Sequence, residues 1–276
     1  MSYYYFLPKP TDEIDSSIVV TDLVANSRGY VHKKVSFQLP VYQFDFTLKV
    51  WRLRKMPPKN SELHWQISST DLDLEPGQIA VVVPIELNAV APKTTGRLPR
   101  PVSRKVDGSP VASRCSLRLH WRGVSSSYQS EYPENMADRH DGQIVSVGFG
   151  GNTNNASTES LFCAVNVSRD TSADSATYRI VAFDSLGLAI EGTEQRAYRN
   201  ACHTIVSRTG ESNCGFGFAG IGALFIPLYV STSASTATRQ MSFEHTHPPS
   251  TMFWREIARE YCMPKFRQSW DGTSNQ

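Results

Sequence analysis

Apolar and polar side chains alternate through the segment from Tyr42 to Leu53, YQFDFTLKVWRL. Between Tyr42 and Val50 every second residue is apolar, which is typical of a strand with one buried face and one solvent-facing face. The alternation slips by one residue at Val50 and Trp51. A slip turns every later side chain to the other face unless a bulge absorbs it, so we predict one long strand with a bulge there.

The same alternation recurs from Arg114 to Val124. The apolar positions of this segment are Cys115, Leu117, Leu119 and Trp121, and the polar positions are Arg114, Ser116, Arg118, His120 and Arg122. We therefore predict a strand with a buried apolar face and a basic outer face. Residues 125–142 are polar, and we predict that they are irregular.

Short segments of this kind occur along most of the chain, with turn-forming residues about every ten positions. Strands do not alternate with helices, which disfavours a parallel α/β sheet. We predict an all-β protein with antiparallel sheets of the β-sandwich or jelly-roll type. One short C-terminal helix is expected at about 251–262, where Phe253, Ile257 and Tyr261 form an i, i+4 stripe.

Two further segments need an interpretation. The first dozen residues contain Pro8 and Pro10, so we expect a tail or an edge strand. The uncharged run from Phe216 to Val230 is shorter than the roughly 20 residues of a membrane-spanning helix, and glycines and Pro227 interrupt it. We predict two buried strand segments joined at a glycine bend, with a membrane-inserting peptide as the alternative, and no transmembrane helix.

Charge is unevenly distributed along the 276 residues, although the formal net charge is only +2. Residues 1–124 hold 17 Lys and Arg against 11 Asp and Glu, whereas residues 125–276 hold 11 against 15. We predict a basic β-rich unit over 1–124, which includes a long loop at 91–113, and a second β-rich unit over 125–276 that ends in the helix. A single domain is the alternative.

Basic residues in and beside the 91–113 loop suit an anionic partner, such as a nucleic acid or a membrane surface. A basic stripe on an edge strand also prevents aggregation without any partner, so this alternative stays open. The candidate residues are Arg52, Arg54, Arg97, Arg100, Arg104, Lys105, Arg114, Arg118 and Arg122.

Two histidines near the C-terminal end of the last predicted strand are the candidate metal ligands. His245 and His247 lie two positions apart, so on a strand they point the same way and can share a transition metal with a third ligand from elsewhere. A purely structural role for both imidazoles is the alternative, and we expect no other cofactor.

The polar stretch from Ser125 to Met136 has the composition of a recognition loop. Tyr128 and Tyr132 would offer amphipathic ring surfaces to a sugar or a protein. An ordinary surface loop is the alternative.

The five cysteines are widely spaced and form no CxxC pair, which disfavours a disulfide framework and indicates buried thiols in a reducing compartment. The segment MSYYYFLPKPTDE lacks the pattern of a secretory signal, so we expect a cytoplasmic or other intracellular location. The common hydrolase, phosphate-loop and zinc-protease motifs do not occur, so the sequence does not favour an enzyme.

These observations favour a non-catalytic β-sandwich protein that forms homo-oligomers and binds an anionic partner. Viral coat, matrix and movement proteins are examples of that plan by fold analogy. The alternatives are a metal-dependent β-barrel enzyme of the cupin type that uses His245 and His247, and a carbohydrate- or protein-binding module.

Overall fold

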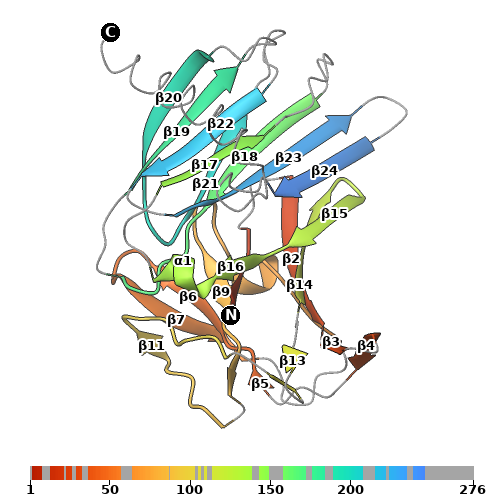
Figure 1. Cartoon of the computed structure of the whole chain (residues 1–276), viewed down its shortest axis with the longest axis vertical. Helices are drawn as coiled ribbons and strands as arrows, with labels where there is room; N and C mark the ends of the chain where they lie inside the picture. Colours follow the sequence, from red (N-terminus) through yellow and green to blue (C-terminus); the bar gives the residue numbers. More distant parts are fainter. Residues whose placement is uncertain are drawn as a thin grey trace. The chain divides into compact units, whose positions relative to one another are not determined.

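The protein is all-β and β-sandwich-like, as the sequence predicts. In the computed structural model, the described residues form strands β1 to β24, one short α-helix and one 3-10 turn, and the strand pairings of known register are antiparallel (Figure 1). The residues described are 2–7, 13–21, 23–26, 29–32, 37–56, 64–86, 88–102, 105–106, 109–110, 114–138, 143–148, 158–171, 176–183, 189–207, 215–221, 224–234 and 239–245.

The chain forms two compact units, each made of several segments. Unit 1 comprises Met1–Arg139, Val165–Asp174 and Arg199–His203, and unit 2 comprises His140–Ala164, Ser175–Tyr198 and Thr204–Gln276. The division into domains 1–124 and 125–276 stays a prediction, because compactness alone does not test which part folds independently.

A six-stranded sheet provides one layer of unit 1. Its strand order is β11-β7-β6-β9-β1-β16. The strands are β1 (Ser2–Tyr5), β6 (Val41–Asp45), β7 (Val50–Lys55), β9 (Ala80–Val82), β11 (Thr94–Thr95) and β16 (Glu131–Pro133).

Strand β1 corrects the expectation of an N-terminal tail or edge strand. It pairs with β9 on one side, where Tyr4 is opposite Val82, and with β16 on the other, where Tyr4 is opposite Glu131. Residues 3–7, YYYFL, are all buried. A strand covered on both faces is apolar throughout and does not alternate, which is why the periodicity did not indicate a central strand here.

The segment Tyr42–Leu53 is a hairpin of β6 and β7, so the prediction of one long strand is wrong. The Asp45 carboxylate accepts hydrogen bonds from the backbone N–H of Thr47 and of Leu48, both at 2.9 Å, and this fixes the turn between the strands. The chain reversal accounts for the slip in alternation at Val50, and the register shift lies instead beside Val41.

A four-stranded sheet, β15-β14-β2-β8, provides a second layer of unit 1. Its strands are β2 (Ile14–Thr21), β8 (His64–Ser68), β14 (Arg114–Trp121) and β15 (Val124–Gln129). The apolar side chains predicted for β14, which are Cys115, Leu117, Leu119 and Trp121, are all buried.

Strand β14 ends at Trp121, three residues before its predicted end. Arg122 and Gly123 have φ of 44° and 87°, the left-handed conformation of a two-residue hairpin turn, and Trp121 pairs with Val124 across it. Residues 124–129 are strand β15, residues 131–133 are strand β16 and residues 134–137 are helix α1, so the prediction that residues 125–142 are irregular is wrong for this part.

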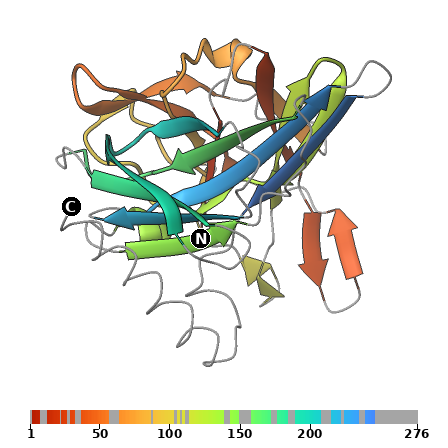
Figure 2. The same cartoon turned by 90° about the horizontal axis from the view of Figure 1, so that it is seen from above.

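Short elements complete unit 1. Figure 2 shows two of them, the antiparallel strands β3 (Leu23–Asn26) and β4 (Gly29–His32), side by side. The others are β5 (Phe37–Gln38) paired with β10 (Ile85–Glu86), β12 (Lys105–Val106) paired with β13 (Ser109–Pro110), the 3-10 turn η1 (Thr70–Leu72) and the helix α1 (Glu134–Ala137).

Residues of unit 2 make up most of two four-stranded sheets, with orders β17-β22-β19-β20 and β21-β18-β23-β24. Their strands are β17 (Gln143–Gly148), β18 (Thr158–Val165), β19 (Ala176–Phe183), β20 (Ala189–Ala197), β21 (Cys202–Ser207), β22 (Gly215–Ile221), β23 (Ile226–Ala234) and β24 (Arg239–His245). The apolar run 216–230 thus supplies β22 and part of β23, which confirms two strand segments. The predicted helix at 251–262 lies outside the described residues.

Candidate functional site: an arginine–carboxylate cluster

An ion pair between a buried arginine and a half-buried aspartate joins two segments of unit 1 that are distant in sequence. Arg169 follows β18, and Asp138 follows α1. Arg169 Nη1 donates to Asp138 Oδ1 at 2.8 Å and to Oδ2 at 3.0 Å, and the Arg169 side chain is only 7% exposed. Because a buried charge is costly without a partner, this pair is a fixed part of the unit.

Two exposed arginines lie on the outer side of this pair. Arg100 Nε is 3.3 Å from Glu134 Oε1, and Arg97 Nη2 is 3.4 Å from Asp138 Oδ1. The side chains of Arg97 and Arg100 are 61% and 69% exposed. The arginine–carboxylate cluster is defined as Arg97, Arg100, Glu134, Asp138 and Arg169.

The segment that carries both exposed arginines is held by backbone contacts. Leu98 N donates to the carbonyl of Arg169 at 3.1 Å, and Arg169 Nε donates to the carbonyl of Leu98 at 3.2 Å. The Tyr3 hydroxyl donates to the carbonyl of Pro99 at 3.0 Å. Burial raises the pKa of Tyr3 well above its ordinary value, so this hydroxyl stays protonated and remains a donor at pH values where an exposed tyrosine ionises.

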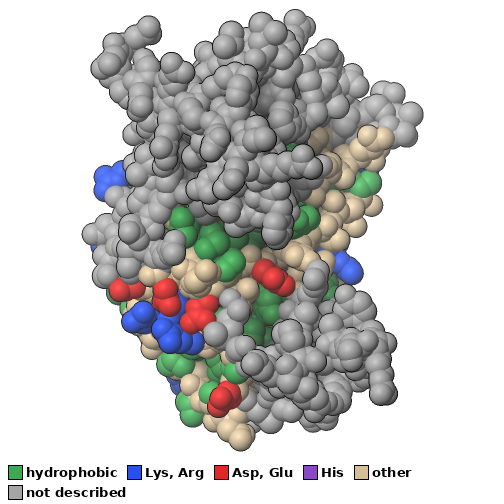
Figure 3. All heavy atoms as spheres, viewed as in Figure 1, with side chains coloured by type: hydrophobic (Ala, Val, Ile, Leu, Met, Phe, Trp, Pro, Cys, Tyr) green, Lys and Arg blue, Asp and Glu red, His purple; other side chains and the backbone are tan. Residues whose placement is uncertain are grey.

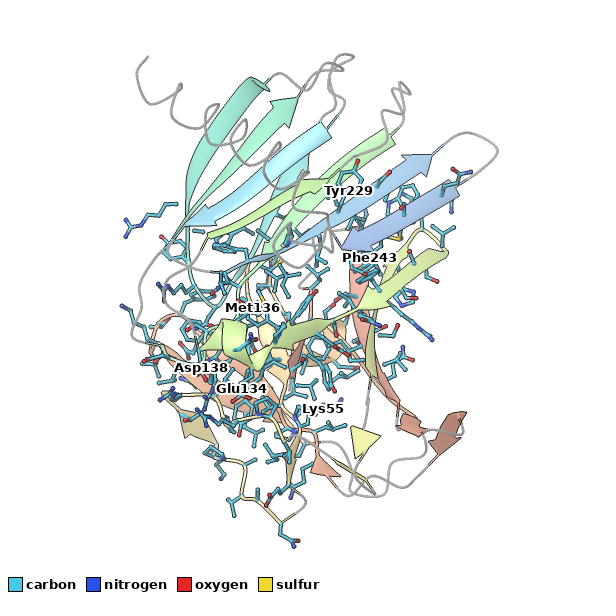
Figure 4. All side chains as sticks on the ribbon, in the orientation of Figure 1. Lys55, Glu134, Met136, Asp138, Tyr229 and Phe243 are labelled. Atoms are coloured by element: carbon cyan, nitrogen blue, oxygen red, sulfur yellow. The ribbon has the colours of Figure 1, made fainter. Side chains whose placement is uncertain are left out.

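The two carboxylates of the cluster belong to Glu134, the first residue of α1, and to Asp138, which directly follows this helix. Glu134 and Asp138 are four positions apart, and Figure 4 labels both beside α1, while Figure 3 shows acidic and basic side chains together on this part of the surface. Within the cluster as defined, three guanidinium groups accompany two carboxylates, so these five side chains carry a net charge of +1, and Asp170 lies opposite Arg97 in a β-bridge. The outer guanidinium groups of the cluster are placed to bind a phosphate or a carboxylate.

The other predicted anion-binding residues lie elsewhere in unit 1. On β7, exposed Arg52 pairs with Asp45 at 2.8 Å, and Arg54 Nη2 donates to the carbonyl of Leu72 at 3.3 Å. On β14, Arg118 is exposed and Arg122, in the following turn, pairs with Glu13. Arg104 lies outside the described residues, and the side chains of Lys105 and Arg114 are not described.

The predicted metal ligands are not resolved into a site. His245 is the last residue of β24 and its side chain is not described, and His247 lies outside the described residues. Among the described residues, no group of three or more His, Cys, Asp or Glu is placed to hold a metal ion. The metal site therefore stays a prediction.

The tyrosines assigned to a recognition loop are both in strands. Tyr132 in β16 is fully buried and its hydroxyl accepts a hydrogen bond from Asn166 Nδ2 at 3.4 Å, so it cannot offer a ring to a ligand at the surface. Tyr128 in β15 is half-buried, and its role in recognition stays a prediction.

Sequence reasoning missed Glu134, Asp138 and Arg169, which complete the cluster. The available signal was the i, i+4 spacing of Glu134 and Asp138 directly after Pro133, which places two carboxylates on one side of a helical turn. Nothing in the sequence linked them to Arg169, because the contact depends on how the chain returns to unit 1.

Comparisons with known proteins do not identify a family. No protein-family model matches the chain, and no curated protein matches it significantly. A crystal structure of the serine-rich repeat protein Srr2 from Streptococcus agalactiae aligns with this chain. The alignment covers 87% of this chain and 82% of the Srr2 chain, with 8% sequence identity and a TM-score of 0.18. Such a low TM-score carries no argument about fold or function. In the described part of the chain, no helix is long and apolar enough to cross a membrane.

Proposed function

We propose that this is a non-catalytic β-sandwich protein that self-assembles and binds the phosphate groups of an anionic partner through Arg97 and Arg100. The observation that carries the proposal is the arginine–carboxylate cluster. Arg169 forms short hydrogen bonds with both carboxylate oxygens of Asp138. The exposed guanidinium groups of Arg97 and Arg100 therefore make longer contacts, at 3.4 Å to Asp138 and at 3.3 Å to Glu134. By fold analogy, viral coat, matrix and movement proteins are the class to which this plan points.

The position of the two arginines favours recognition of a phosphate rather than a purely structural role. Exposed ion pairs contribute little to stability, about 0 to 1 kcal/mol, so the arrangement is not needed to hold the fold together. A phosphate can replace the long contacts of Arg97 and Arg100 with short charge-assisted hydrogen bonds, while the Arg169–Asp138 pair keeps the segment in place.

Binding of single-stranded RNA by the full chain tests this proposal. Fluorescence anisotropy of a labelled oligonucleotide, measured over a series of salt concentrations, gives the affinity and its salt dependence. We expect R97A/R100A to weaken binding about tenfold and to reduce the slope of log K against log salt by about 1 to 2. Vesicles with and without phosphatidylserine, assayed by co-sedimentation, distinguish a membrane partner from a nucleic acid.

A matched control removes the same charge from unit 2. R196A/R239A loses two exposed arginines from β20 and β24, and we expect it to retain the affinity and salt slope of the wild-type protein within about twofold. If R97A/R100A binds RNA and anionic vesicles as tightly as this control does, the proposed role of the cluster is wrong.

A further inference from the structure

Strand β15 is an edge of the four-stranded sheet in unit 1, and among the described residues it pairs with β14 alone. It spans six residues, VSSSYQ, which include neither a charge nor a proline. The other edges of the two larger sheets of unit 1 are shorter: β11 has two residues, β16 three and β8 five.

The turn before β15 determines which backbone groups lie on its open side. In a two-residue hairpin, the residues that flank the turn exchange hydrogen bonds, so Trp121 and Val124 form such a pair. Hydrogen-bonded and non-hydrogen-bonded residue pairs alternate along the two strands. Ser130 and Cys115 are expected to be a hydrogen-bonded pair in this alternation, and Ser130 N does donate to the carbonyl of Cys115. The N–H and C=O groups of Ser125, Ser127 and Gln129 therefore point away from β14.

An open edge of this kind normally carries a feature that prevents pairing with another strand. Charged residues, prolines, bulges and short length are the usual devices. Strand β16 has Glu131 and Pro133, and β11 is only two residues long. Among the described residues of unit 1, strand β15 has none of these devices, and its side chains alternate regularly between half-buried and exposed positions. Its open side is therefore suited to accept an extended strand.

We propose that two copies of this chain pair antiparallel through β15, with Ser127 of each copy opposite Ser127 of the other. Centring the pair on Ser127 sets Ser125 opposite Gln129, and it aligns the outward backbone groups of the two strands for hydrogen bonding. All six residues are uncharged, so no like charges meet within the strand pair, and hydroxyl and amide side chains face each other.

The neighbouring charges are compatible with this two-fold arrangement. Arg118 lies opposite Ser127 on β14, so the two copies of Arg118 would be separated by three strand spacings, or about 14 Å. That distance exceeds the Debye length of about 8 Å at physiological salt, and repulsion between them is weak. The two four-stranded sheets would join into one continuous sheet through an isologous interface.

This inference rests on the self-assembly part of the proposed function, and a cysteine cross-link tests the register directly. In the proposed pair, the Cα atoms of the two copies of residue 127 lie about 5.5 Å apart, which suits a disulfide, whereas the two copies of residue 125 lie about 14 Å apart along the strands. With diamide as the two-electron oxidant, we expect S127C to form a covalent dimer. The matched variant S125C and the wild-type protein should remain uncross-linked.

Light scattering after size-exclusion chromatography provides the second measurement. We expect S127K, which sets two ammonium groups against each other at the two-fold axis, to weaken self-association at least tenfold, and S127T to leave it unchanged. Circular dichroism checks that both variants fold, as expected for an exposed position.

The outcomes separate the two proposals. If the wild-type protein is oligomeric but S127K leaves its mass unchanged and S127C forms no disulfide, the β15 interface is wrong and self-assembly stands. Equal cross-linking of S125C and S127C overturns the register. A wild-type protein that stays monomeric up to high micromolar concentration overturns both self-assembly and the β15 interface, but not RNA binding.

Discussion

Arg169 binds both carboxylate oxygens of Asp138 while its Nε donates to the carbonyl of Leu98. One buried guanidinium group thus joins the end of α1 to the segment that carries Arg97 and Arg100. Arg169 also donates its backbone N–H to the carbonyl of Ala137, so the two segments are connected through side chain and backbone together.

We predict that Arg169→Ala lowers the free energy of unfolding by about 2 kcal/mol, because it removes the charge-assisted hydrogen bonds from a buried guanidinium group to Asp138 and its hydrogen bond to the carbonyl of Leu98. Arg100→Ala, which removes an exposed guanidinium group from the same cluster, should change it by less than about 0.5 kcal/mol. Urea unfolding monitored by tryptophan fluorescence measures both values. Equal effects of the two variants would contradict the role given to Arg169.

Tyr42→Phe should raise the free energy of unfolding by about 1 kcal/mol. The Tyr42 hydroxyl is buried and has no hydrogen-bond partner among the described residues, so its removal relieves the cost of desolvation. Tyr3→Phe on the same sheet should lower the value by about 1 kcal/mol, because its hydroxyl donates to the carbonyl of Pro99. The midpoint temperature of thermal unfolding, measured for both variants, should therefore rise for Tyr42→Phe and fall for Tyr3→Phe relative to the wild-type protein.

Alkaline pH should destabilise unit 1. Burial raises the pKa of Tyr42 to about 12, and it also raises the pKa values of Tyr3 and Tyr132. A group whose pKa is raised by folding stabilises the folded state fully below its unfolded pKa of about 10, and this contribution is lost as pH rises towards the folded pKa. We expect tyrosinate absorbance at about 295 nm from these residues to appear together with the loss of β-sheet circular dichroism. Complete ionisation of all tyrosines while the sheet signal is intact would refute this prediction.

Asp45→Ala should lower the free energy of unfolding by about 1 kcal/mol, because the β6–β7 turn loses the acceptor for the N–H groups of Thr47 and Leu48. Asp45→Asn keeps a side-chain acceptor and loses only the exposed ion pair with Arg52, so we expect a change below about 0.5 kcal/mol. Chemical denaturation of both variants makes the comparison. A loss of the same size in Asp45→Asn would show that the ion pair, and not the turn, is responsible.

The sequence predicted strands best where one face of the strand is exposed to solvent and the other is buried. On β14 the alternation identified the buried residues correctly, because Leu117 and Leu119 face the interior while Arg118 and His120 face solvent. The central position of β1 was missed, and a tail or an edge strand was expected there, because both of its faces are covered and its run of tyrosines shows no period. The hairpin at Asp45 was missed because alternation alone does not detect a chain reversal, although an Asp two residues before Thr47 is a recognised turn signal.

The candidate site was only partly predictable. Arg97 and Arg100 were identified from the composition of their loop, because a run of basic residues near prolines and glycines is visible in a single segment. Their carboxylate partners and Arg169 depend on three separate segments meeting in unit 1. Local sequence patterns contain no information about such long-range contacts, and the helix α1 that carries Glu134 has only four residues, too few to show a periodicity.

The central position of β1 has a consequence for synthesis of the protein. Tyr4 is synthesised well before Val82 and Glu131. In the folded sheet, Tyr4 lies between these two residues and pairs with both. The backbone N–H and C=O groups of the nascent β1 therefore lack their partners from β9 and β16 until most of unit 1 has been translated. Pairings between residues so far apart in sequence form slowly, so closure of this sheet is expected to be a late step in folding.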